Sequence, residues 1–199
     1  MRIRIVALLG VTVSAIAAAC GRGAAAGRAD AAPTHVDGVR SRDVEVRQFR
    51  EGLVEPVGLS GGAPSRDALV QRYVRALEQS DTAALAALVI TRAEFAYLYY
   101  PTTPQARPPY DLSPGLMWFL LQEHSRRGMV HAIEERGGRP LGYLGYACDQ
   151  MPSREGENTV VGPCLVRRRQ SGDVVQERLF GLIIGRGRSY KFVSLANKL

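Results

Sequence analysis

Aromatic side chains gather in the middle of the sequence and are its best candidates for ligand binding. Six of the eight tyrosines lie between residues 97 and 146, together with the single tryptophan. A tyrosine in a concave apolar site can orient a ligand through its hydroxyl group or donate a hydrogen bond to a developing oxyanion. The alternative is that these rings are ordinary core, with their hydroxyl groups at its edge. Our candidate ligand-binding residues are Tyr97, Tyr100, Trp118, His124, Tyr143 and Tyr146.

Histidine offers a second kind of chemistry. His124 and His131 lie seven residues apart, so an unbroken helix would bring them to one face, but metal-chelating pairs on a helix are usually four apart. We therefore expect no metal site and no cofactor. A general acid/base pair of His124 with Asp111 or Asp149 is the enzymatic alternative. The sequence has no P-loop, H-E-x-x-H or dinucleotide-binding motif.

The first nineteen residues have the pattern of an export signal. Arg2 and Arg4 precede an uncharged apolar run over residues 5–19, which is shorter than the roughly 20 residues of a membrane-spanning helix. We predict that residues 1–19 are a signal peptide. The chain is then expected to be exported and to work outside the cytoplasm.

A cysteine follows this run directly. The stretch "AIAAAC", which ends at Cys20, resembles the lipobox of bacterial lipoprotein precursors, whose cysteine is acylated and becomes the new N-terminus. Lipoboxes usually carry Leu where this chain has Ala17. The resemblance implies a membrane-anchored lipoprotein that faces the periplasm or exterior, because two acyl chains hold a protein stably on a bilayer. Secretion as a soluble protein after cleavage behind Ala19 is the alternative.

The two remaining cysteines form an even pair. In an oxidising compartment Cys148 and Cys164 are expected to form a disulfide, which for a loop of this length contributes about 3 kcal/mol. Two buried free thiols are the alternative. A zinc site is not expected, because no histidine lies near either cysteine.

The charge of the chain points only weakly to a partner. The full chain carries +7, and removal of Arg2 and Arg4 leaves 24 basic against 19 acidic residues, or +5. The basic residues are scattered apart from residues 167–169, which alternate across a predicted strand and could give one partner to Glu177. A basic exported protein can bind anionic headgroups or wall polymers, although a soluble arginine-rich surface explains the charge equally. No motif supports nucleic acid as a partner.

Composition divides the mature chain into three parts. Residues 20–41 are rich in Gly and Ala and lack the large apolar residues needed for a core, so they are predicted to be a flexible, lipid-anchored tether. Residues 42–64 carry a few apolar side chains and are predicted to be an extended segment docked on the domain. Residues 65–199 are predicted to be a single domain.

Helix signals come first in this domain. Ser65, Asp81 or Ser80, Thr91 and Ser113 are candidate N-caps, and Thr91 has the spacing of a capping box with a glutamate three residues later. We predict that the last of these helices is interrupted at Gly128 and ends at Gly137. The segment 95–105 could be helix or strand.

Strand signals follow from Pro140 onward. Turn-forming residues separate four apolar runs, so an antiparallel meander is the natural arrangement. Helices before strands predict an α+β protein, with N-terminal helices packed on one face of a curved antiparallel sheet of about four strands. The four runs cover residues 140–148, 158–168, 174–184 and 189–196.

The order of these elements, with the opening "YVRALEQSDTAALAAL", resembles the NTF2-like superfamily, which includes the SnoaL-like proteins. The resemblance spans residues 65–199. It departs from the family where a strand is usual between the second and third helices, so a cystatin-like or other helix-on-sheet fold stays open. It implies a cone with a pocket at one end, which in that superfamily is catalytic, binds a ligand or is only a packed core.

These observations predict an exported binding or interaction module of the cell envelope with a pocket for a small ligand. Its partners would be the membrane, through the lipidated N-terminus, and a small ligand or an envelope protein of unknown identity. The alternative is an NTF2-like enzyme, an isomerase, dehydratase or hydrolase, that uses a His or Asp with a Tyr in the cone. No carboxylate lies within an apolar strand or helix face where its pKa would be raised, which favours binding.

Overall fold

A computed structural model describes residues 41–197 of the chain. The predicted signal peptide, the candidate lipidation site Cys20 and nearly all of the predicted tether lie outside the described residues. Within the described part, no helix is both long enough and apolar enough to cross a membrane.

Local capping explains where the helices begin. The Ser65 hydroxyl accepts the Ala68 N–H at 3.1 Å, the Asp81 carboxylate accepts the Ala84 N–H at 2.8 Å, and Thr91 completes a capping box. These predicted caps are confirmed. The helical elements are α1 (Arg42–Arg50), α2 (Arg66–Glu78), α3 (Thr82–Ala87), α4 (Arg92–Glu94), a π-helical turn (Phe95–Tyr99), a 3-10 turn (Pro104–Ala106) and α5 (Pro114–Arg136).

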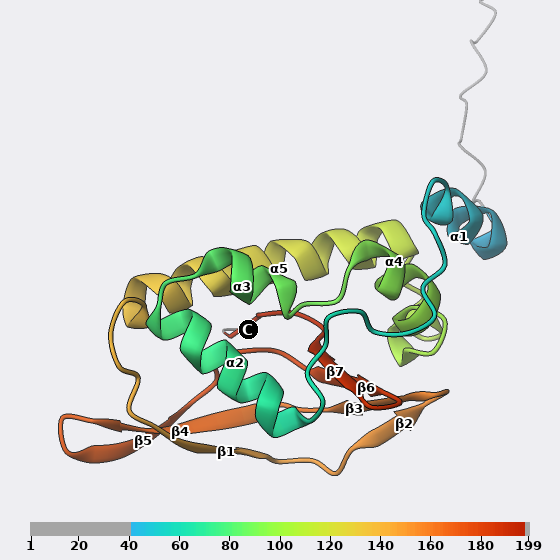
Figure 1. The fold of residues 1–199 in the computed structure, drawn as a ribbon. Coiled ribbons are helices and arrows are strands. Elements are labelled where there is room, and N and C mark those ends of the chain that lie inside the picture. The colour runs from blue at the N-terminus through green and yellow to red at the C-terminus, as the bar shows by residue number, and fades with distance from the viewer. Residues whose placement is uncertain (1–40, 198–199) are drawn as a thin grey trace, which may run out of the picture. The chain divides into compact units, whose positions relative to one another are not determined.

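Seven strands form two antiparallel sheets within the described residues. One sheet has the order β1-β4-β5 and the other the order β2-β3-β6-β7. In Figure 1, α2, α3 and α5 lie over one face of these strands, which confirms an α+β fold with helices on one side. The strands are β1 (Tyr143–Cys148), β2 (Ser153–Glu155), β3 (Asn158–Val161), β4 (Cys164–Gln170), β5 (Asp173–Glu177), β6 (Ile183–Arg186) and β7 (Ser189–Phe192).

The structure divides the four predicted runs into more and shorter strands, and the antiparallel order of the runs is confirmed. Pairing continues along the chain from run to run, but the second and third predicted runs are each interrupted once. Pro163 stands between β3 and β4, where its missing N–H cannot take part in a ladder. Residues 149–157, predicted to be turn, contain the short strand β2.

The segment before the predicted domain is partly helical. Residues 42–64 were expected to be extended, but α1 occupies the first nine of them. Asp43 and Glu45 in its first turn and Arg47 and Arg50 in its last turn suit the helix dipole. Phe49 of this helix packs edge-on against Phe95 with ring centroids 5.6 Å apart.

The predicted interruption at Gly128 is also wrong, because α5 runs unbroken for 23 residues. A Cβ atom at this position would lie 2.0 Å from the Leu195 carbonyl oxygen. The glycine thus lets the C-terminal segment approach the helix closely, and Asn197 Nδ2 donates to the Gly128 carbonyl at 2.9 Å. The predicted end of the helix at Gly137 is confirmed, and the open segment 95–105 is helical in its first half.

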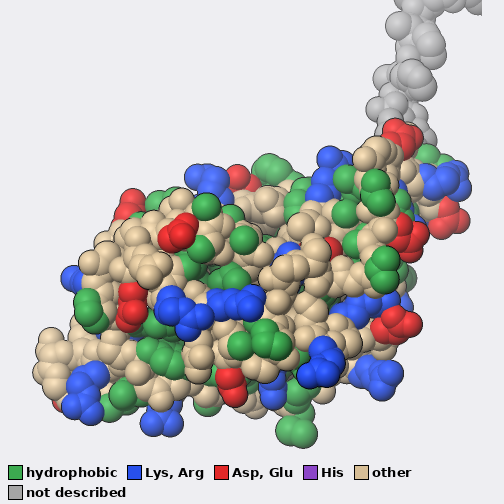
Figure 2. Space-filling model, in the orientation of Figure 1, with side chains coloured by type: hydrophobic (Ala, Val, Ile, Leu, Met, Phe, Trp, Pro, Cys, Tyr) green, Lys and Arg blue, Asp and Glu red, His purple; other side chains and the backbone are tan. Residues whose placement is uncertain are grey.

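Aromatic packing joins the helices to the sheet. The Tyr73 ring of α2 meets Phe180 and Phe192 edge-on at 5.5 and 5.6 Å, and its hydroxyl donates to the Leu179 carbonyl at 2.8 Å. Cys148 and Cys164 face each other across β1 and β4 and form the predicted disulfide. Figure 2 shows basic side chains at separate places on this face of the molecule, including a group over α2, in keeping with the scattered charge of the sequence.

Candidate functional site

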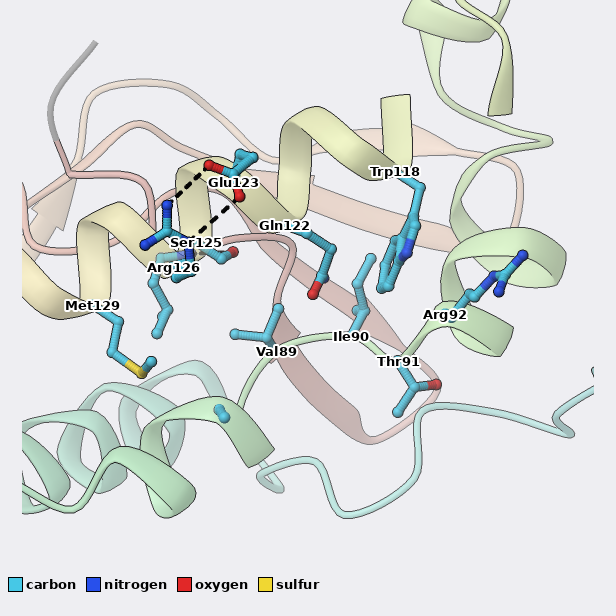
Figure 3. Close-up of a pocket in the computed structure, with 12 residues that line it drawn as sticks. Val89, Ile90, Thr91, Arg92, Trp118, Gln122, Glu123, Ser125, Arg126 and Met129 are labelled. Atoms are coloured by element: carbon cyan, nitrogen blue, oxygen red, sulfur yellow. Dashed lines mark hydrogen bonds and ion pairs between the residues drawn. The ribbon is translucent and has the colours of Figure 1, made fainter. Parts of the chain in front are cut away.

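The main candidate site is a cavity of about 460 Å³ on the helical side of the fold. It lies between α5 and the chain that links α3 to α4, with the C-terminal segment as its third wall (Figure 3). We call it the α5 cavity. Its lining residues are Ala86, Val89, Ile90, Thr91, Arg92, Trp118, Gln122, Glu123, Ser125, Arg126, Met129 and Leu195.

One face of α5 supplies the first wall. Trp118, Gln122, Ser125 and Met129 are spaced by four, three and four residues, so they lie along one side of the helix. The Trp118 ring packs against Phe95 with centroids 5.2 Å apart, which fixes its orientation. In Figure 3, Trp118 points from the helix toward Ile90 across the cavity.

The second wall is a short non-helical stretch that the sheet holds in place. Ile90 N–H donates to the Phe192 carbonyl at 2.9 Å, and Phe192 N–H donates to the Leu88 carbonyl at 2.8 Å. These bonds extend the pairing of β7 onto the chain between α3 and α4. Val89 and Ile90 are therefore buried apolar walls on a rigid backbone.

A fully buried ion pair anchors the end of this wall. One oxygen of Glu94 accepts the Thr91 N–H at 2.7 Å and the Lys191 ammonium at 2.9 Å, and the other accepts the N–H and hydroxyl of Ser60 at 2.6 and 3.0 Å. The side chains of Glu94 and Lys191 are 1% and 2% exposed. Burial alone would raise the pKa of Glu94, but the hydrogen bonds from Thr91, Lys191 and Ser60 lower it below its usual range. Sequence reasoning found the capping box but not Lys191, which lies 97 residues away.

The third wall is joined to α5 through the hydroxyl group of Ser125. Ser125 Oγ accepts the Leu195 N–H at 3.0 Å, so this buried serine joins α5 to the C-terminal segment. Leu195 itself is buried and adds apolar surface. The serine is thus a structural group of the cavity.

The polar side chains at the rim of the α5 cavity differ in whether they already have a partner within the protein. Glu123 and Arg126 bond to each other at 3.1 Å on the solvent side of α5, and the hydrogen bond from Arg126 lowers the pKa of Glu123. Arg92 lies over the Phe49 ring at 4.6 Å and donates to the Phe49 carbonyl at 3.4 Å. Gln122, by contrast, extends into the cavity in Figure 3, and its amide has no hydrogen-bond partner among the described residues.

Of the six residues selected from the sequence, the structure places only Trp118 in the cavity. Tyr100 donates to the Leu112 carbonyl at 2.8 Å and is buried, while Tyr97 lies under the Arg50 guanidinium at 4.4 Å. Both rings belong to the helical layer around Phe95 rather than to a cavity wall. Neither lines the α5 cavity, so their role in ligand binding stays a prediction beside the alternative of ordinary core.

The other three candidates lie elsewhere. Tyr146 on β1 donates to the Asp67 carboxylate at 3.0 Å, and Tyr143 on the same strand packs against the edge of the core. His124 is exposed on α5 and does not line the cavity. The enzymatic pairing of His124 with Asp111 gains no support, because Asp111 forms an ion pair with Arg42. Spacing along the chain could not show that these residues belong to different layers.

The cavity residues that sequence reasoning missed are mostly apolar. Val89, Ile90 and Leu195 carry no recognisable motif and are brought together by β7 and α5. The only available signal was the spacing of Gln122, Ser125 and Met129 with Trp118 along one helix face.

The described residues contain no group of three or more His, Cys, Asp or Glu side chains that could hold a metal ion. The fold and the cavity define an α+β protein with a ligand-sized cavity beside α5. Comparisons with protein-family models, with curated proteins and with solved structures find no match to this chain.

Proposed function

We propose that this protein is an exported, lipid-anchored binding protein of the cell envelope whose α5 cavity binds a small apolar molecule with one polar group. The observation that carries the proposal is the cavity itself. Its volume of about 460 Å³ falls within the roughly 300 to 1,000 Å³ of typical small-molecule sites. Apolar walls with few polar groups are also typical of such sites.

The lining supports this ligand chemistry. Val89, Ile90, Met129 and Leu195 offer aliphatic surface, and the Trp118 ring offers a flat face for an aromatic or ring-shaped ligand. The Gln122 amide can both donate and accept a hydrogen bond to a polar end group. Each basic side chain of the rim already has a protein partner, which favours an uncharged ligand.

The side chains of the cavity favour binding over catalysis. Ser125 is engaged by the Leu195 backbone, and Glu123 is an exposed carboxylate paired with Arg126. Neither forms the pair of nucleophile and base that covalent catalysis needs. The residues of the α5 cavity therefore fit a carrier or sensor of small molecules.

Export and anchoring are supported by the N-terminal sequence. Arg2 and Arg4, the apolar run over residues 5–19 and Cys20 form the pattern described above. The disulfide between Cys148 and Cys164 suits an oxidising compartment outside the cytoplasm. We also propose an NTF2-like fold, because helices cover one face of antiparallel strands that follow them in the chain.

The single tryptophan of the chain allows a direct test of the cavity. Trp118 should transfer excitation energy to a bound apolar dye, and N-phenylnaphthylamine is a suitable probe because it is uncharged and carries one N–H group. Saturable transfer is expected. Ala86→Phe should reduce dye affinity about tenfold, since the exposed Ala86 lies at the cavity and a phenyl ring would occupy it.

Ala83→Phe is the matched control. It makes the same change at an exposed position of α3 that does not line the cavity, and dye affinity should stay within about twofold of wild type. Equal binding by the Ala86→Phe variant and wild type would rule out the α5 cavity as the dye site.

The anchor is tested by fractionation. Cys20→Ser should move the protein from the membrane fraction to the soluble fraction, because both acyl chains depend on the thiol of that residue. Unchanged partitioning would contradict lipid anchoring and leave the cavity proposal untouched.

A further inference from the structure

A second, smaller pocket lies where the C-terminal end of α5 meets β4. Its volume is about 260 Å³, and four arginines line it, two from the end of α5 and the chain beyond and two from β4. No acidic side chain lines it. We call it the arginine pocket, and its arginines are Arg136, Arg139, Arg168 and Arg169.

Two of these arginines share one carboxylate behind the pocket wall. Arg136 donates to both oxygens of Glu177 at 3.1 and 3.0 Å, and Arg168 also donates to both oxygens, once at 3.2 Å. The side chains of Arg168 and Glu177 are 6% and 22% exposed. Burial alone would raise the pKa of Glu177, but the two guanidinium groups lower it to about 2.

The local charge is not balanced by this carboxylate. Glu135 lies 3.5 Å from Arg136, and Glu78 accepts the N–H of the pocket residue Leu141 at 2.7 Å, so three nearby carboxylates face four guanidinium groups. Arg139 donates one N–H to the Glu135 backbone carbonyl. The Arg169 side chain makes no hydrogen bond among the described residues. A surplus of positive charge beside a nearly buried arginine is costly without a counter-ion.

The frame of the pocket is rigid. Arg168 is held by Glu177 and by Gln170 Oε1, which accepts its N–H at 2.6 Å. The Arg169 N–H donates to the Gly142 carbonyl at 2.8 Å, which fixes the backbone beside the pocket. Side chains ordered before binding lose little entropy when a ligand arrives.

We propose that the arginine pocket binds a phosphate group, either as a free phosphate or phosphate monoester or as the phosphodiester of a lipid headgroup. The planar guanidinium fork matches the geometry of phosphate oxygens and forms bidentate, charge-assisted hydrogen bonds with them. A volume below that of typical drug-sized sites suits such a compact group. This site is separate from the α5 cavity and does not depend on what that cavity binds.

Calorimetric titration of the full chain with two soluble probes tests the proposal. One probe is inorganic phosphate, and the other is glycerophosphoglycerol, a soluble copy of a lipid headgroup. The titrations are made at about 0.15 M salt, where screening suppresses diffuse attraction to a basic surface. Saturable binding of at least one probe is expected, and the probe that binds more tightly identifies the source of the phosphate group.

Three variants locate the binding. Arg169→Gln and Arg139→Gln remove pocket arginines that make no side-chain ion pair, and each should weaken binding about tenfold. Arg167→Gln is the matched control, because it removes the same charge from an exposed neighbour on β4 that does not line the pocket, and its affinity should stay within about twofold of wild type.

Two outcomes would overturn the proposal. One is the absence of saturable binding of either probe up to about 10 mM. The other is an equal loss of affinity in the Arg167→Gln and Arg169→Gln variants, which would show attraction to the basic surface as a whole. Circular dichroism of each variant confirms that the fold is retained.

Discussion

The two pockets along α5 differ in the charge balance and burial of the ion pairs beside them. The wall of the α5 cavity is anchored by Glu94 and Lys191, one anion and one cation that are both almost completely buried. The arginine pocket is backed by Glu177, one anion shared by two cations, at a site that is partly exposed. The balanced pair leaves no charge to attract a ligand, whereas the unbalanced one leaves a surplus. A buried pair with equal charges therefore only stabilises a wall of the α5 cavity, whereas a partly exposed group with excess positive charge can bind an anion.

The largest expected effect comes from breaking the balanced pair. Lys191→Met leaves the Glu94 carboxylate buried without its cation and should lower the free energy of unfolding by about 3 to 5 kcal/mol. The double variant Glu94→Gln/Lys191→Met should recover part of this loss, because no unpaired charge remains. Urea unfolding of both variants measures the difference. A loss below about 1 kcal/mol for Lys191→Met would mean that the pair behaves like an exposed one.

Close packing of the C-terminal segment against α5 gives the next largest effect. Gly128→Ala would bring a methyl group within 2.0 Å of the Leu195 carbonyl oxygen and should destabilise the protein by about 1 to 3 kcal/mol. It should also weaken dye binding in the α5 cavity, since Leu195 is a cavity wall. Gly115→Ala is the control on the same helix, because nothing lies within 4 Å of its added methyl group and alanine favours helix. Equal stability of the two variants would argue against the close approach.

Lowering the pH should show how much the Glu177 carboxylate, paired with Arg136 and Arg168, contributes to stability. The folded-state pKa of Glu177 is about 2, below the unfolded value, so its stabilising effect is complete above about pH 5 and is lost as pH falls toward 2. Glu177→Gln should remove this part of the pH dependence while the contribution of Glu94, whose pKa is also lowered, remains. Thermal unfolding from pH 6 to pH 2 gives both curves. Identical slopes would show that the guanidinium groups do not stabilise the ionised carboxylate.

The smallest effect is expected at the rim of the α5 cavity. Glu123 and Arg126 form an exposed pair three residues apart, and such pairs contribute little to stability in water. Glu123→Gln should leave the unfolding midpoint and the affinity for N-phenylnaphthylamine unchanged. A clear loss of dye affinity would instead show that this carboxylate at the edge of the cavity interacts with the bound dye.

Local chemistry is the part of this fold that the sequence predicts well. The caps at Ser65, Asp81, Thr91 and Ser113 each involve residues three apart, and all four are present. The pairing of Arg168 with Glu177 also follows from neighbouring strands of one hairpin. Interactions between residues that are near each other in the sequence can be predicted without knowing the rest of the fold.

The sites were harder to predict because their residues come from distant parts of the chain. Lys191 reaches Glu94 across 97 residues, and Leu195 meets Ser125 across 70. Gly128 looked like a helix breaker because its conformational freedom is a local property, while its contact with Leu195 is not. The tyrosines were grouped by position in the chain, although β1 and the helical layer place them apart.

By itself, the sequence determined the α+β class, the starts of the helices, the antiparallel order of the strands and the disulfide between Cys148 and Cys164. These follow from short-range hydrogen bonding, from hydrophobic periodicity and from the even count of cysteines. Only the tertiary structure decided that Trp118, Ile90 and Leu195 share a cavity and that four arginines surround a pocket. The physical reason is that a cavity is defined by what surrounds it, and its walls are set by long-range packing of segments whose own sequences carry no sign of it.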